Sequence, residues 1–143
     1  MKKSPAFEFL PHTADIKIRA YGKTLEEAFK NSALALKEVM SDNTKIAQKS
    51  KQKIEIESED KESLLYDFLE QFLYLFDAES FILSKIENLS INKSKNKMVL
   101  KAEIIGDNSK NYKFTNDVKA ITYNEMSIKK HKNGFAITFV LDV

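Results

Sequence analysis

The chain has 143 residues, of which 43% are hydrophobic and 31% are charged, a composition that predicts one domain with a substantial core over residues 1–143. Lys and Arg number 23 and Asp and Glu 21, so the net charge of +2 neither requires nor excludes a nucleic-acid partner. The absence of cysteine excludes disulfides and thiolate chemistry and fits a cytoplasmic location. We see neither a signal peptide nor the ~20-residue apolar run of a membrane span, so no membrane association is expected.

The first strand and helix are indicated by a change in hydrophobic period. Residues 16–21 alternate apolar and polar side chains, which predicts a strand with one buried face. Gly22 ends this strand. Thr24 and Glu27 then form the pattern of a capping box, and apolar residues at helical spacing predict an amphipathic helix over residues 24–40.

The rest of the chain predicts a second helix and five more strands. A lysine-rich stretch, residues 41–51, predicts an exposed loop before a short strand at residues 54–56. A broad apolar face predicts a deeply buried helix over residues 61–77. Asn133-Gly134 is a hairpin signal between the last two strands. The C-terminal strands are expected at residues 82–91, 98–105, 118–130 and 135–143.

This order of elements predicts an α+β fold with two helices packed on a mostly antiparallel sheet. We expect both helices to cover one face of a sheet that includes the four C-terminal strands. The side chains expected in the core between helices and sheet are Phe29, Leu36, Leu65, Phe68, Leu69, Phe72 and Phe76.

Carboxylates stand at the ends of two predicted strands. Asp15 precedes the first strand, and Asp142 ends the last one beside the terminal carboxylate of Val143. If these strands are neighbours, the carboxylates form an oxygen-rich cluster of the kind that binds calcium or magnesium. Periodicity does not give the order of the strands. The hairpin does predict that Asp142 lies opposite residues 119–124, within reach of Lys119 and Thr122.

Each of these residues also has a plainer interpretation. Asp15 suits a turn in which its carboxylate accepts backbone hydrogen bonds, and terminal residues such as Asp142 and Val143 are commonly solvated. His12 follows a proline and suits a structural hydrogen bond, while His131 lies among lysines and suits a solvated turn. We therefore assign no catalytic residue.

Several segments, in this order along the whole chain, resemble the archease family. They are His12-Thr13-Ala14-Asp15-Ile16, Thr24-Leu25-Glu26-Glu27-Ala28-Phe29, Leu64-Leu65 with Phe68-Leu69 and Leu73-Tyr74-Leu75, Val118-Lys119-Ala120-Ile121-Thr122-Tyr123, and Leu141-Asp142-Val143.

The resemblance implies a small cytoplasmic protein with an α+β fold that serves as a cofactor of the RtcB-type tRNA-splicing RNA ligase. Archeases promote guanylylation of the ligase's active-site histidine and so allow multiple turnover; tRNA is reached indirectly through the ligase. The resemblance also implies a divalent metal site, usually read as calcium, held by Asp15, Asp142 and the Val143 carboxylate. His12, Lys119 and Thr122 are candidate contacts with the partner.

The chain departs from the family pattern after the Val118–Tyr123 motif. Many archeases have a histidine where this chain has Asn124, and Ile121 replaces the usual valine. Asparagine carries no charge and shuttles no proton, which puts any role of that histidine in doubt here. The metal assignment does not depend on it.

Three functional classes follow from the sequence. A non-catalytic ligase activator is favoured, since we find no nucleophile motif, glycine-rich phosphate loop or His-Glu metal signature. A chaperone-like modulator of a tRNA methyltransferase is the second, and binding to that enzyme rather than to a ligase would select it. The third is a metal-dependent phosphohydrolase that uses Asp15 and Asp142, which turnover of phosphoesters by the pure protein would reveal.

Overall fold

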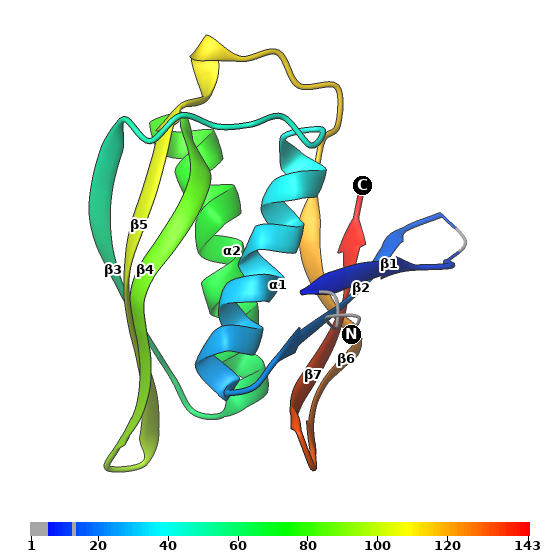
Figure 1. Ribbon diagram of the computed structural model, residues 1–143, viewed down its shortest axis with the longest axis vertical. Coiled ribbons are helices and arrows are strands. Elements are labelled where there is room, and N and C mark those ends of the chain that lie inside the picture. The colour runs from blue at the N-terminus through cyan, green and yellow to red at the C-terminus, as the bar shows by residue number, and fades with distance from the viewer. Residues whose placement is uncertain (1–5, 13) are drawn as a thin grey trace.

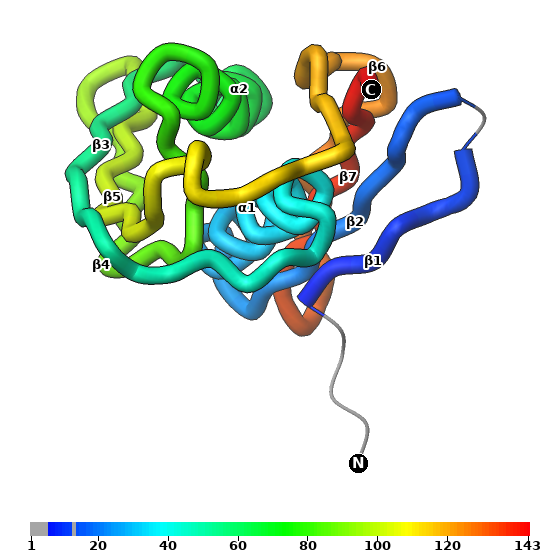
Figure 2. The backbone as a smooth tube through the Cα atoms, turned by 90° about the horizontal axis from the view of Figure 1, so that it is seen from above, coloured from blue at the N-terminus to red at the C-terminus, as the bar shows by residue number. Residues whose placement is uncertain are grey.

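A computed structural model describes residues 6–12 and 14–143 and places two helices between two antiparallel sheets (Figure 1). The view from above shows the same three layers (Figure 2). In chain order the elements are β1 (Phe7–Leu10), β2 (Ile16–Gly22), α1 (Leu25–Met40), β3 (Ser50–Ser58), α2 (Lys61–Glu79), β4 (Phe81–Ser94), β5 (Lys97–Asn108), the 3₁₀ turn η1 (Ser109–Asn111), β6 (Ala120–His131) and β7 (Gly134–Asp142).

The α+β class with helices on antiparallel sheets is confirmed, but the single sheet predicted for the four C-terminal strands is wrong. The first sheet has the order β1-β2-β7-β6, and the second has the order β3-β5-β4. The chain crosses from one sheet to the other between β5 and β6, through residues 109–119. Strand β5 pairs with β4 and β3, whereas β6 pairs with β7. The prediction is wrong because hydrophobic periodicity identifies a strand but not the strands that pair with it.

Helix α1 begins at the predicted cap. The Thr24 hydroxyl accepts a hydrogen bond from the Glu27 amide at 3.1 Å, which satisfies one of the free donors of the first turn. The Glu27 carboxylate accepts from the Lys23 amide at 3.3 Å, so the return bond of the predicted capping box goes to Lys23 instead of Thr24. Helix α1 then packs against both sheets, mainly through β2 and β4.

Helix α2 contributes more of the largest fully buried side chains than any other element. A reciprocal capping box between Asp60 and Ser63 starts the helix, one feature that hydrophobic pattern alone does not indicate. Phe68 contacts Phe29 of α1 with ring centroids 5.9 Å apart, which joins the two helices. Six of the seven predicted core residues are buried; Phe76 is only half-buried and packs against Phe114.

The segment before β3 differs from the exposed loop predicted over residues 41–51. Ile46 is buried, and its carbonyl accepts a hydrogen bond from the Ser84 hydroxyl at 2.9 Å. The Ala47 amide donates to the Tyr112 hydroxyl at 2.9 Å. This segment is therefore fixed to the second sheet and to residue 112 by side chains that lie far away in the sequence. Strand β1, four residues long, was not predicted because it is too short to show a period.

Within residues 6–12 and 14–143, neither helix is long and apolar enough to span a membrane.

The central core gives a direct test of this layered packing. Phe68 is fully buried, so Phe68→Ala is expected to lower the free energy of unfolding by about 3–5 kcal/mol through lost burial and a residual cavity. Tyr74→Ala, at a 57% exposed position of the same helix, is the matched control and is expected to have a much smaller effect. Urea unfolding of both variants measures the difference. Equal stabilities for the two variants would contradict the packing described here.

Candidate functional site

Asp15 and Asp142 lie at the same end of the four-stranded sheet. Strand β2 pairs with β7 so that Ile16 faces Leu141, and continuing this register by one residue brings Asp15 opposite Asp142. On the other side of β7, Ala120 of β6 faces Asp142. The sheet thus establishes the strand order that periodicity left open. We call Asp15, Asp142 and Val143 the carboxylate end.

Burial of the alternate residues orients this end. Leu141 is fully buried against the helices, and Ile121 beside it is also buried. Because side chains alternate along a strand, Asp142 is directed to the opposite face, and it is exposed. The Lys119 amide donates to the Asp142 carbonyl at 2.8 Å, so the backbone of β7 is held in place as far as Asp142, its last residue. Val143 is 38% exposed.

The donors at this end suit a hard divalent cation. Carboxylate oxygens are the usual ligands of calcium, and like-charged groups brought together favour a cation between them. Among residues 6–12 and 14–143, no three His, Cys, Asp or Glu side chains form a group that could hold a metal ion. The predicted ligand set is of another kind, since it joins two side chains to the main-chain carboxylate of Val143, and it stays a prediction.

A large bulge in β6 lies next to the carboxylate end. Thr122 faces Val140 and Ser127 faces Thr138, so the four residues 123–126 lie opposite the single residue Phe139. Within the bulge Glu125 has φ = 59°, a left-handed conformation that is uncommon for a residue other than glycine. Bulges of this kind redirect side chains, and this one redirects Tyr123 and Glu125 in particular.

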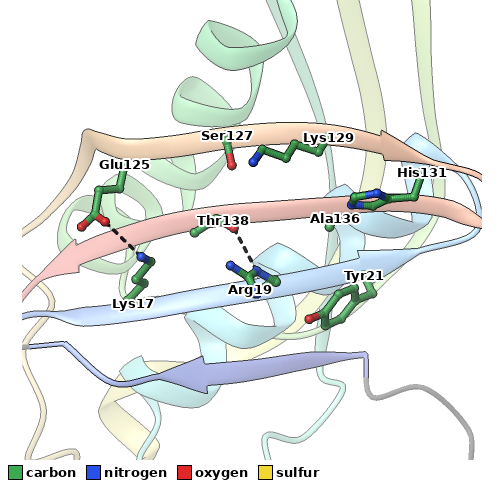
Figure 3. A pocket seen from close by; sticks show the side chains of 9 residues that line it. All are labelled: Lys17, Arg19, Tyr21, Glu125, Ser127, Lys129, His131, Ala136 and Thr138. Atoms are coloured by element: carbon green, nitrogen blue, oxygen red, sulfur yellow. Dashed lines mark hydrogen bonds and ion pairs between the residues drawn. The ribbon is translucent and has the colours of Figure 1, made fainter.

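Glu125 reaches across β7 and ties three segments together. Its carboxylate lies 3.0 Å from Lys17 Nζ on β2 (Figure 3). It also lies 2.8 Å from His12 Nε2. In the strand register Lys17 lies opposite Val140. The Val140 side chain belongs to the outer face of the sheet, yet it is only 1% exposed. Lys17, and then His12, hold the pKa of Glu125 below its ordinary value through hydrogen bonds and charge attraction.

Tyr123 links the bulge to helix α2. Its ring stacks on Tyr66 with centroids 4.3 Å apart and planes within 6°, yet 55% of Tyr123 remains exposed. Asn124 follows it on the surface, and the Asn124 amide donates to the Thr122 hydroxyl at 3.2 Å. The Thr122 side chain therefore stabilises the bulge from inside the strand.

The structure separates the predicted site residues into two groups. Asp15, Asp142, Val143 and Lys119 gather at the sheet end, and Lys119 is exposed there. His12 and Thr122 instead hold the bulge through Glu125 and Asn124. His131 lies at the β6–β7 turn, at the other end of these strands. Thr13 of the His12–Ile16 motif lies outside the described residues.

Sequence reasoning missed Glu125 and Tyr123. His131 faces Gly134, so regular pairing would place Asp142 opposite Tyr123, whereas it faces Ala120. The predicted range of 119–124 includes the observed partner but does not reveal the bulge. The left-handed residue is a glutamate instead of a glycine or asparagine, so the local sequence gives no signal for this irregularity.

Comparisons with known proteins find a matching family and similar sequences. The model of the Archease protein family matches residues 7–143. Proteins named "Protein archease" from Sulfurisphaera tokodaii and Saccharolobus islandicus are 40% and 43% identical to the chain; each match covers 96% of this chain, and 98% and 99% of the relative.

Two solved structures share the fold. The solution structure of Methanobacterium thermoautotrophicum protein 1598 matches with a TM-score of 0.83 and 34% identity, covering 96% of this chain and 99% of that one. The crystal structure of "an archease, possible chaperone" from Thermotoga maritima matches with a TM-score of 0.55, covering 100% and 98%. At 15% identity the second likeness concerns the fold alone.

The interactions of Glu125 predict a pH-dependent contribution to stability. Because its pKa is lowered in the folded state, the contribution is present above the unfolded pKa of about 4.3 and is lost as the pH falls through the folded value. Glu125→Gln should lower the melting temperature at pH 7, and the difference from wild type should shrink below about pH 4. Glu57→Gln, which removes a surface pair with Lys97 at 3.4 Å, is the control and should shift melting less. If the difference in melting temperature between Glu125→Gln and wild type were the same at pH 7 and below about pH 4, it would contradict this assignment.

Proposed function

Because the chain belongs to the archease family, we propose that it is a non-catalytic cofactor of an RtcB-type RNA ligase in tRNA splicing and RNA repair. In this proposal it promotes guanylylation of the ligase's active-site histidine and allows each ligase molecule to act repeatedly. The chain reaches tRNA through the ligase, and no residue of its own forms or breaks a bond.

The observation that supports the proposal is the β2–β7 register, whose last pair is Ile16 with Leu141; one residue further along, Asp15 would lie opposite Asp142. We propose that these two side chains and the Val143 carboxylate bind one divalent cation, with calcium as the expected ion. A cation bound there would neutralise phosphate charge and orient phosphate groups. Asp142 and Val143 are exposed, so this end is free to enter or abut a nucleotide site on a partner.

The surroundings of the carboxylate end support a docking role. Lys119 is exposed just before β6, and further along that strand Tyr123 stacks on Tyr66 of α2 to form an aromatic surface. Stacked tyrosines suit an interface because they offer contact area with little loss of side-chain freedom on binding. His12 and Thr122, also expected as partner contacts, would act by holding the bulge in place.

A second candidate function is a chaperone-like modulator of a tRNA methyltransferase. One solved protein with this fold is described as a possible chaperone, which favours retaining this alternative. It requires binding to a methyltransferase and no effect on ligase guanylylation. A pull-down with both enzymes from the same host separates the two candidates.

Loss of the carboxylate end should abolish ligase activation without unfolding the protein. Asp15→Ala and Asp142→Ala each remove a carboxylate from a crowded end, so relief of repulsion offsets the lost contacts, and melting temperatures should stay close to wild type. Both variants should fail to stimulate guanylylation and multiple-turnover RNA joining by the host ligase. A few residues added after Val143 should be equally harmful, because they remove the carboxylate and add bulk.

The matched control is Glu55→Ala, which removes an exposed carboxylate from the opposite sheet. It should stimulate the ligase as well as wild type does. If the two alanine variants and the extended chain are folded and stimulate the ligase as well as wild type does, activity belongs to another surface. The proposed role of the carboxylate end is then wrong.

A further inference from the structure

The outer face of the four-stranded sheet carries an open groove along β7, with a volume of about 530 Å³ (Figure 3). Helices α1 and α2 cover the other face of this sheet. The floor consists of the small side chains Ala136 and Thr138 of the inner strand β7. We call this hollow the β7 groove. Its walls are formed by Lys17, Arg19 and Tyr21 of β2 and by Glu125, Ser127, Lys129 and His131 of β6.

Strand geometry explains the shape of the groove. Strands β2 and β6 flank β7, so the two rows of long side chains stand about two strand spacings apart, roughly 9.5 Å. The register places Arg19 beside Thr138 and Lys129 beside Ala136. Long side chains on both sides of a low floor form a channel parallel to the strand.

The two carboxylates near the groove already have hydrogen-bonding partners. Glu125 binds Lys17 and His12, and Glu8 of β1 accepts from the Tyr21 hydroxyl at 2.6 Å. Burial and that bond to Glu8 raise the pKa of Tyr21, so its hydroxyl stays protonated.

Two cations in the groove are left for a ligand. In the part of the chain that the structure describes, Arg19 and Lys129 form no ion pair within 4.0 Å. The Arg19 Nε donates to the Thr138 hydroxyl at 3.3 Å, which holds the guanidinium over the floor. Arg19 also lies beside the Tyr21 hydroxyl, where its charge opposes the rise in the pKa of Tyr21, and opposite Glu8 in the β1–β2 register. The groove therefore presents an arginine, a lysine and the neighbouring His131 and Ser127 as hydrogen-bonding groups.

The groove points toward the carboxylate end. Along β2, outward-facing residues follow the order Tyr21, Arg19, Lys17, and the next position in this alternation is Asp15. A polyanion would therefore bind over Arg19 and Lys129, and the Glu125 bridge and the carboxylates beyond it would limit how far it extends along β7.

We propose that the β7 groove binds the phosphate backbone of single-stranded RNA. Guanidinium and ammonium groups bind phosphate oxygens, and the rings of Tyr21 and His131 offer faces on which bases can stack. An acidic peptide could pair with the same cations but would gain less from these rings. This inference goes beyond the proposed function, which needs contact with the ligase alone.

The test is binding of a labelled single-stranded RNA of about 12 nucleotides, followed by fluorescence anisotropy over a series of salt concentrations. Arg19→Gln combined with Lys129→Gln should weaken binding about tenfold and reduce the slope of log affinity against log salt by about 1.4, as expected for two lost phosphate contacts. Lys129→Glu alone, at an exposed position, should weaken binding at least as much as one lost contact. The matched control is Lys97→Gln combined with Lys101→Gln, two exposed lysines of β5 on the other sheet, and should bind like wild type.

Three results would overturn the proposal: wild type that shows no salt-dependent binding, a control that weakens as much as the groove variants, or polyglutamate that competes as well as RNA. Guanylylation of the ligase measured without RNA keeps this inference separate from the proposed function. Groove variants should stimulate that step like wild type. If wild type does not stimulate it, the proposed function fails while RNA binding is still measured independently.

Discussion

The antiparallel pairing of β2 with β7 is the interaction on which both candidate surfaces depend. It joins residues more than a hundred positions apart, and buried pairs such as Ile18 with Phe139 fix its register against the helices. A shift by one residue would turn those side chains outward and the charged ones inward, so the register is strongly specified. The same register places Asp15 beside Asp142 and Arg19 beside Thr138. Core packing on one face thereby determines the chemistry of the other.

The bulge in β6 adds a second level of organisation to this sheet. Three additional residues in one strand allow Glu125 to cross β7 and Tyr123 to reach α2. Glu125 neutralises Lys17 near the carboxylate end and leaves Arg19 and Lys129 as the cations of the groove. A left-handed glutamate is costly locally, so the surrounding bonds to Lys17 and His12 must hold it in place. One irregularity thus separates the acidic and the basic parts of a single sheet face.

Sequence alone predicted most of the elements because their hydrophobic periods are long and clear. The two helices, the hairpin after β6 and the burial of residues such as Phe68 follow from local pattern. The pairing of the strands does not follow from local pattern, because hydrophobic periodicity carries no information on which strands are neighbours. The division into two sheets is therefore not predicted. Whether Asp15 lies near Asp142 depends on strand order, which the sequence does not give. Glu125 could not be found because its role depends on a bulge with no glycine or asparagine at the left-handed position.

The central claim is that Asp15 and Asp142 serve as two ligands of one cation, and crystallography in excess calcium tests it most directly. The account predicts a single ion with oxygens of Asp15, Asp142 and Val143 at roughly 2.3–2.6 Å, and waters completing its coordination. Binding of calcium to either aspartate alone, or carboxylates directed to opposite sides of the sheet and too far apart to share an ion, would contradict the account.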